Sequence, residues 1–127
     1  MTTFTDLAVT SFTMGVINTA PTTESHTTTN AAIGIKDGVV LLSKVAGPLT
    51  MTLANPTATT DDWKRLVILA TTAQAHTVAI ATIGFGNAGA AKVKASFSGV
   101  IGDSLELMAY GGFWYVTGFH QVTFGTA

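Results

Sequence analysis

The chain of 127 residues contains no cysteine, few charged residues and only three prolines. Without cysteine the protein forms neither a disulfide framework nor a thiolate metal site, and it has no thiol nucleophile. Charged residues make up 10% of the sequence, against about 25% in typical soluble domains. Such a deficit is typical of surfaces that other subunits cover. The composition therefore favours a subunit of an assembly over a freely diffusing monomer.

The charge balance argues against nucleic acid as a partner. Six basic residues are offset by seven acidic ones, for a formal net charge of -1, whereas binding a phosphate backbone requires a basic face. The amino terminus lacks the basic region and the unbroken apolar run of a secretory signal. We therefore expect the protein to be made in a cytoplasm.

Residues 66–91 carry no charge and are numerous enough to span about 30 Å of hydrocarbon as a helix. The stretch nevertheless contains Gln74, His76, Asn87 and three glycines, and its segment "HTVAIAT" alternates with the period of a strand. These features predict two strands and a loop, and no contact with a membrane.

Residues 1–32 differ from the rest of the chain. Scattered apolar side chains are followed by "NTAPTTESHTTTN", which holds no large apolar residue and cannot bury enough surface to fold alone. We predict an extended arm and a Thr-rich tether over 1–32 and a single β domain over 33–127, so that the fold would survive removal of residues 1–30. We expect the arm to add a strand to a partner's sheet through Phe4, Leu7, Val9 and Phe12. The alternative is that residues 7–17 form an ordinary first strand of the domain.

After residue 32, strand signals follow at short intervals. Asp37-Gly38 predicts a two-residue hairpin with Lys36 opposite Val39 and Ile35 opposite Val40. Further strands are expected in "LTMTL", "KRLVILAT", "HTVAIAT" and "KVKASF", and no window carries a helical stripe. We predict an all-β fold of seven or eight strands: an antiparallel sandwich, a jelly roll or a partly closed barrel with an extended amino-terminal arm.

The segment "MAYGGFWYVTGF", residues 108–119, predicts a second hairpin. Two adjacent glycines permit positive φ at both turn positions. The turn sets Tyr110 opposite Phe113 and Met108 opposite Tyr115. In the same register three further pairs follow, namely Ala109 with Trp114, Leu107 with Val116, and Glu106 with Thr117.

This register divides the hairpin into two faces. One face is apolar and suits a core: Leu105, Leu107, Ala109, Trp114 and Val116. The other combines Glu106 and Thr117 with Met108, Tyr110, Phe113 and Tyr115, which is too apolar for a solvated surface and too polar for a second core. We interpret these last four residues as an interface with another copy or a partner. The alternative is that a loop of the same chain shields them.

No catalytic, cofactor or metal site emerges from the sequence. The histidines at 26, 76 and 120 lack metal-ligand spacing, and Asp61-Asp62 and Asp103 are explained by turns. The glycine-rich "GFGNAG" at 84–89 precedes a predicted strand, whereas a phosphate-binding loop needs a helix there. We find no serine elbow and no carboxylate pair, and we therefore expect a protein without enzymatic activity and without a cofactor.

Two segments resemble small structural proteins of tailed bacteriophages: "LTMTLANPTATTDDWKRLVILATTAQAHTVAI" and "FSGVIGDSLELMAYGGFWYV". The resemblance covers residues 49–119. In this part the chain is similar to capsid decoration, or cement, proteins. The chain departs from the pattern at Gly111-Gly112 and at Trp63, where a small turn residue is expected. Trp63 adds a large side chain to a loop and is a further candidate for contact with a neighbour.

The resemblance implies a virion protein that sits as a homotrimer on the outside of a phage head and binds the major capsid protein. Similar sequences also occur in head-fibre and tail-fibre modules, so host recognition through carbohydrate binding is the alternative. A fibre normally carries an extended shaft, which this sequence lacks. A small β-barrel hydrolase or lipid carrier is the third possibility, and the missing catalytic constellation counts against it.

Overall fold

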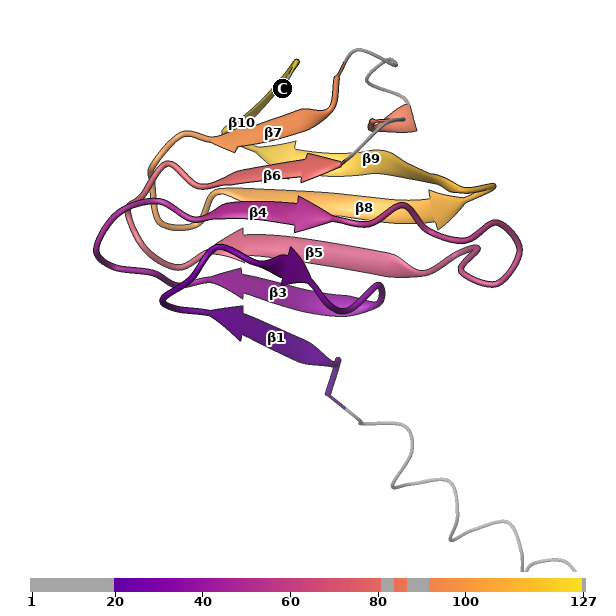
Figure 1. Ribbon diagram of the computed structural model, residues 1–127, viewed down its shortest axis with the longest axis horizontal. Helices are drawn as coiled ribbons and strands as arrows, with labels where there is room; N and C mark the ends of the chain where they lie inside the picture. The colour runs from indigo at the N-terminus through magenta and orange to yellow at the C-terminus, as the bar shows by residue number, and fades with distance from the viewer. Residues whose placement is uncertain (1–19, 81–83, 87–91, 127) are drawn as a thin grey trace, which may run out of the picture.

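The computed structural model describes residues 20–80, 84–86 and 92–126, which form β-strands in two layers (Figure 1). Within these ranges there is no α-helix, and hence no helix that is able to cross a membrane. The all-β class predicted from the sequence is confirmed. The strands are β1 (Thr23–His26), β2 (Ala32–Ile33), β3 (Gly38–Leu42), β4 (Thr50–Leu53), β5 (Arg65–Ala70), β6 (Thr77–Ile80), β7 (Lys94–Phe97), β8 (Ser104–Tyr110), β9 (Phe113–His120) and β10 (Val122–Gly125).

The strands form two sheets of five that face each other without closing into a barrel. Sheet A has the order β1-β3-β5-β8-β9, and sheet B has the order β10-β7-β6-β4-β2. From β1 to β6 the chain changes sheet after every strand, so that it winds in coils of two strands each (Figure 1). Strand β7 follows in sheet B, and β8, β9 and β10 then complete both sheets.

This winding makes half of the strand pairs parallel. The pairs β1-β3, β3-β5, β2-β4 and β4-β6 are parallel, whereas β5-β8, β8-β9, β6-β7 and β7-β10 are antiparallel. The predicted antiparallel sandwich is therefore wrong in strand direction, because a chain that returns to the same sheet after a whole coil arrives in the same direction.

The predicted hairpin at Asp37-Gly38 does not form. Strand β2 lies in sheet B and β3 in sheet A, so Ile35 and Lys36 do not pair with β3. Gly38 does have the positive φ of 126° that a tight turn favours. The chain uses it to cross between sheets, and the Asp37 carboxylate accepts a hydrogen bond from the backbone N of Arg65 at 3.3 Å.

Part of the segment predicted as a tether belongs to the sandwich. Thr23–His26 forms β1, the edge strand of sheet A, and pairs with β3. The Asn30 side chain accepts a hydrogen bond from the backbone N of Thr50 at 2.8 Å. Removal of residues 1–30 would therefore delete an edge strand that was predicted as tether, although every buried core residue of the described ranges follows residue 32, as predicted. Residues 1–19, with the predicted arm, lie outside the described ranges.

The core lies between the inner faces of the two sheets. In β4 the alternation predicted from "LTMTL" is confirmed, because Met51 and Leu53 are buried and Thr50 and Thr52 are exposed. The largest core residue is Trp114 of β9, which is fully buried and donates its indole Nε1 hydrogen to the carbonyl oxygen of Ala54 at 2.9 Å. Burying one such ring contributes several kcal/mol, since Trp→Ala substitutions cost about 3–5 kcal/mol.

Candidate functional site: an exposed aromatic cluster

The hairpin of β8 and β9 forms as the two glycines predict. Gly111 and Gly112 have φ values of 60° and 88°, which matches a turn with positive φ at both central positions. Four predicted pairs are confirmed: Tyr110 with Phe113, Ala109 with Trp114, Met108 with Tyr115, and Leu107 with Val116.

The fifth predicted pair is wrong. Glu106 lies opposite Gly118, not Thr117, because a β-bulge shifts the register between Glu106 and Leu107. A bulge adds an unpaired residue to one strand and increases its twist. The signal in the sequence is Gly118, which follows Thr117 within the strand, because an isolated glycine inside a strand often marks a bulge.

The inner and outer faces of the hairpin are those predicted. Leu105, Leu107, Ala109 and Trp114 are buried in the core, and Val116 packs against it. On the other face, Met108 and Tyr115 are half-buried, and Tyr110 and Phe113 are exposed. The structure thus brings together the four residues that the sequence singled out as an interface.

Trp63 joins this group from the loop between β4 and β5. Its ring centroid lies 4.9 Å from that of Tyr110, while those of Phe113 and Tyr115 lie 6.2 Å apart. Both distances are within the range of aromatic pairs that attract each other. Although it touches Tyr110, Trp63 remains 66% exposed. We call Trp63, Tyr110, Phe113 and Tyr115 the aromatic cluster.

The backbone at Trp63 is strained. Its φ is 74°, in the left-handed region that bulky residues avoid. A small residue is expected here, and the conformation supplies the physical reason. A large exposed ring at such a position costs on the order of 1–2 kcal/mol. Strain of this kind is concentrated at functional sites. Thr59 and Gln121 also have positive φ, of 71° and 55°, and Trp63 has the largest side chain of the three.

Hydrogen bonds tie the Trp63 loop to the hairpin. The backbone N of Trp63 donates a hydrogen bond to the carbonyl oxygen of Ala109 at 2.7 Å. The backbone N of Ala109 in turn donates to the carbonyl oxygen of Lys64 at 2.9 Å. The carboxylate of Asp62 accepts hydrogen bonds from the backbone N of Gly111 at 2.9 Å and of Thr59 at 3.1 Å. Loop and hairpin turn are thus held together, and the rings are presented in a fixed arrangement.

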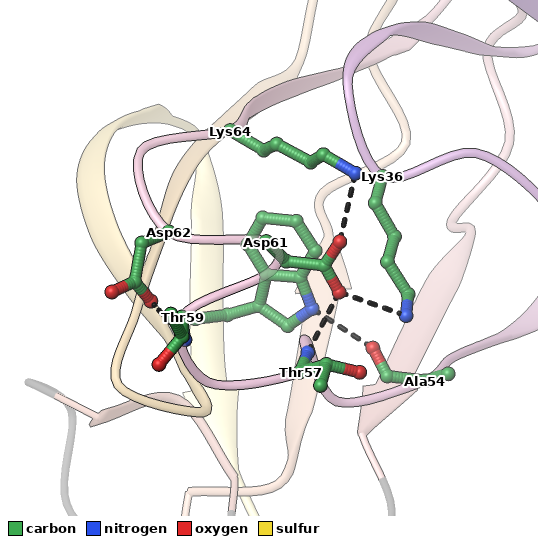
Figure 2. A network of polar contacts seen from close by, with 8 residues as sticks. Lys36, Ala54, Thr57, Thr59, Asp61, Asp62 and Lys64 are labelled. Carbon is green, nitrogen blue, oxygen red and sulfur yellow. Dashed lines mark hydrogen bonds and ion pairs between the residues drawn. The ribbon is translucent and has the colours of Figure 1, made fainter.

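Beneath this loop, Asp61 is the centre of a charged network (Figure 2). It is 4% exposed. One carboxylate oxygen accepts from Lys64 Nζ at 2.8 Å, and the other from Lys36 Nζ at 3.1 Å and from the backbone N of Thr57 at 2.7 Å. The hydrogen bonds from Lys64, Thr57 and Lys36 hold the pKa of Asp61 well below its usual range. The network fixes the loop, and the predicted turn at Asp61-Asp62 is confirmed.

The other acidic turn, at Asp103, is also confirmed. One Asp103 oxygen accepts hydrogen bonds from Ser98 Oγ at 2.7 Å and from the backbone N of Gly99 and Val100 at 3.1 and 3.2 Å. Burial acts to raise the pKa of Asp103, but the hydrogen bonds outweigh it and the pKa is lowered. The carboxylate thus closes the loop before β8.

The three histidines lie apart in the fold. His26 is on β1, where its Nε2 is 2.7 Å from Glu24 Oε1, and His120 ends β9. His76, which the sequence placed at a turn, is fully buried. Within the described ranges, no group of three or more His, Asp or Glu residues is arranged to hold a metal ion. Part of the glycine-rich stretch at 84–89 lies outside those ranges.

His76 is held as a neutral ring. Its Nδ1 accepts a hydrogen bond from the backbone N of Leu49 at 2.9 Å. Its Nε2 lies 3.1 Å from Thr72 Oγ1, which donates its own hydrogen to the carbonyl oxygen of Lys44 at 2.6 Å. Nε2 must therefore carry the ring proton. Burial lowers the pKa of His76, and the charge of Lys44 acts in the same direction.

The apolar residues on the outer face of β3 and β5 were not predicted as part of a site. Val39 and Leu41 of β3 and Val67 and Leu69 of β5 are half-buried on the outer face of sheet A. The available signal was the unbroken apolar run in each strand, "VVLL" and "LVILA", which is typical of strands covered on both faces.

Comparison with known proteins assigns no family. No protein-family model matches the chain, and no curated protein matches it.

Proposed function

We propose that this protein is a virion structural protein of the capsid-decoration type, a binding module that docks on the outside of a phage head and stabilises contacts between major capsid proteins. The aromatic cluster is the observation that carries the proposal. Rigid, exposed aromatic side chains are the residues that dominate protein interfaces, and this cluster includes a strained Trp63 that the fold itself does not require.

The rest of the molecule is consistent with this role. The resemblance of residues 49–119 to decoration proteins motivates the virion location, the homotrimer and the capsid partner. The low charge content suits a subunit that is covered on assembly. A second contact is proposed for the arm residues Phe4, Leu7, Val9 and Phe12, which would add a strand to a capsid protein's sheet; this part rests on the sequence alone.

Binding to heads tests the proposal. Purified protein is mixed with empty phage heads, and bound protein is measured after sedimentation. We expect saturable, stoichiometric binding that the Trp63→Ala, Phe113→Ala double variant loses. Ile101→Ala is the matched control, because Ile101 is 65% exposed and is not part of the cluster. Failure of the wild-type chain to bind, or equal loss in the control, contradicts the proposal.

Carbohydrate recognition is the second candidate, because the exposed and mutually tilted rings of Trp63 and Tyr110 are also suited to contact a flat, partly apolar ring. A glycan array distinguishes it from the first. A glycan that binds the wild type and not Trp63→Ala, together with no binding to heads, would favour a host-recognition module.

A further inference from the structure

The outer faces of the two sheets differ sharply in chemistry. On sheet B, the register aligns Thr50, Thr77, Ser96 and Thr123 in one row across four strands. The next row contains Thr52, Ala79, Lys94 and Gly125. These side chains are small or polar, as expected for a face in contact with water.

The outer face of sheet A has an apolar centre. Val39 pairs with Val67, and Leu41 with Leu69, so four aliphatic side chains form a block on β3 and β5. Polar residues border this block, namely Thr23 and Ser25 on β1 and Glu106 and Ser104 on β8. Met108 and Tyr115 pair with each other in the neighbouring row of β8 and β9, where Met108 lies opposite Arg65. The four aliphatic residues, Met108 and Tyr115 all remain half-buried, and the aromatic cluster adjoins them. Sheet B offers a comparison within the same chain, because its two aligned rows contain no large aliphatic side chain.

The sequences of the parallel strands also indicate that the outer face of sheet A is covered. Parallel strands are found mostly in sheets whose two faces are both covered, and they then read as unbroken apolar runs. Strands β3 and β5 have such runs, although only their inner side chains are buried. The parallel strands β4 and β6 of sheet B instead alternate, as "TMTL" and "TVAI". The outer face of sheet A is thus built to be covered.

The charges on this face bear on what covers it. Arg65 lies opposite Met108, and Glu106 lies opposite Val67, so one cation and one anion border the aliphatic block. No ion pair within the described residues involves either side chain. A face that carries one charge of each sign complements a second copy of itself, whereas a partner of strong single charge would meet repulsion at one of the two.

The dimensions of the face limit how strongly copies can associate through it. Five strands at about 4.8 Å spacing span roughly 20 Å, and a six-residue strand is about 20 Å long. The resulting footprint, on the order of 400 Å², is below the roughly 800 Å² that each partner buries in a standard interface. Association through this face is therefore expected to depend on protein concentration.

We propose that copies of this chain pack against one another through the outer face of sheet A, with Arg65 of one copy beside Glu106 of the next. The choice of surface rests on the two sheet faces alone, and a contact of this face with itself joins two copies at a time. The inference adds Val39, Leu41, Val67, Leu69 and Arg65 to the interface.

The first test places a charge at the centre of this face. Val67→Lys is compared with Thr77→Lys, which introduces the same side chain on the outer face of sheet B. Sedimentation equilibrium should find the wild type and Thr77→Lys associated and Val67→Lys monomeric, with β-type circular dichroism in all three. A Val67→Lys protein that assembles like the wild type, or a wild type that is monomeric at every concentration, overturns the proposal.

The second test exchanges the charges. Arg65→Glu and Glu106→Arg should each weaken association, because each variant places like charges together across the interface. The double variant should restore association toward that of the wild type. If neither single variant changes association, or if the double variant is weaker than both, Arg65 and Glu106 do not meet across the interface.

A third test addresses the rival occupant of this face, the chain's own residues 1–19. In the full chain, Phe4, Leu7, Val9 and Phe12 are replaced by serine. We expect association to be unchanged. If the wild type is monomeric and the serine variant associates, the segment covers the face and the proposal is overturned.

These tests separate the two proposals. A protein that associates but does not bind heads contradicts only the decoration function. One that binds heads and whose association is unaffected by Val67→Lys contradicts only the inference on sheet A.

Discussion

Trp63 shows how a single residue can conflict with its backbone. The loop requires positive φ at this position, which glycine adopts without cost and other residues adopt with strain. The loop is nevertheless anchored on both sides, by the Trp63 N to Ala109 hydrogen bond and by Asp62. The surrounding structure therefore imposes the conformation, and the exposed ring is retained in spite of it.

A pair of substitutions measures this strain. Trp63→Gly and Trp63→Ala both remove the ring and its contact with Tyr110, and they differ in tolerance of positive φ. We expect the glycine variant to be more stable than the alanine variant by up to about 1 kcal/mol, measured by urea unfolding. Equal stability of the two would show that the backbone at this position is relaxed.

His76 makes the stability of the fold sensitive to pH. Its pKa in the folded protein is lowered below 6.5, the ordinary value for histidine, so the unfolded chain binds a proton at this ring more readily than the folded protein does. Stability is therefore complete above pH 6.5 and is lost as the pH falls below it. Protonation of Nδ1 would also remove the hydrogen bond from Leu49, because the N–H groups of His76 and Leu49 would then repel each other.

Unfolding measurements at several pH values test this dependence. Below pH 6.5, the free energy of unfolding should decrease with a slope of at most about 1.4 kcal/mol per pH unit from this group. His76→Asn, whose side-chain oxygen is able to accept the hydrogen bond from Leu49, should be less stable at neutral pH and should lack this part of the slope. An identical pH profile in the variant would remove His76 as the cause.

At the scale of the strands, the position and alternation of a strand were predictable from the sequence, whereas the strand with which it pairs was not. The alternation in β4 and the glycine turn after Tyr110 both depend on neighbouring residues, and both were predicted correctly. The sheet to which each strand belongs depends on pairs distant in sequence, such as Val39 with Val67. A local signal at Asp37-Gly38 therefore indicated a turn correctly and a hairpin wrongly.

The candidate site, too, was predictable where it depends on neighbouring residues and not where it depends on distant ones. Four members of the interface lie on one hairpin, whose register fixed their common face. Trp63 was found only as a departure from a resemblance, and its contact with Tyr110 joins residues 47 positions apart. The aliphatic block on β3 and β5 was missed, because its strands were assumed to be antiparallel with one face in water.

Gly38 and Gly47 provide a matched test of the crossing from sheet B to sheet A. Both have positive φ, of 126° and 99°. A Cβ on Gly38 would lie 2.1 Å from the carbonyl oxygen of Thr22, whereas one on Gly47 would meet nothing within 4 Å. Gly47→Ala should cost about 1–2 kcal/mol through backbone strain alone. Gly38→Ala should cost clearly more, because β1 must also move, and similar losses would contradict the close packing of β1 against this crossing.

The molecule as a whole has one polar outer face and one with an aliphatic block at its centre, and this asymmetry predicts how its stability varies with protein concentration. An oligomer that forms only from folded chains raises the midpoint of thermal unfolding as protein concentration increases. We expect this rise in the wild type and in Thr77→Lys and not in Val67→Lys, as measured by calorimetry over a range of concentrations. A midpoint independent of concentration in all three would argue against assembly through sheet A.

The winding of the first six strands also means that the fold could be lengthened by inserting whole turns of the chain. Val39 pairs with a residue 28 positions later, and Thr52 with one 27 positions later, so each complete turn of the chain adds one strand to each sheet. A tandem copy of residues 39–66 would extend both layers together and leave the closing strands β7 to β10 unchanged. Because the added strand in sheet A would repeat Val39 and Leu41, each such duplication would widen the apolar face. Relatives that differ in size by whole turns would thus differ in the strength with which their subunits adhere.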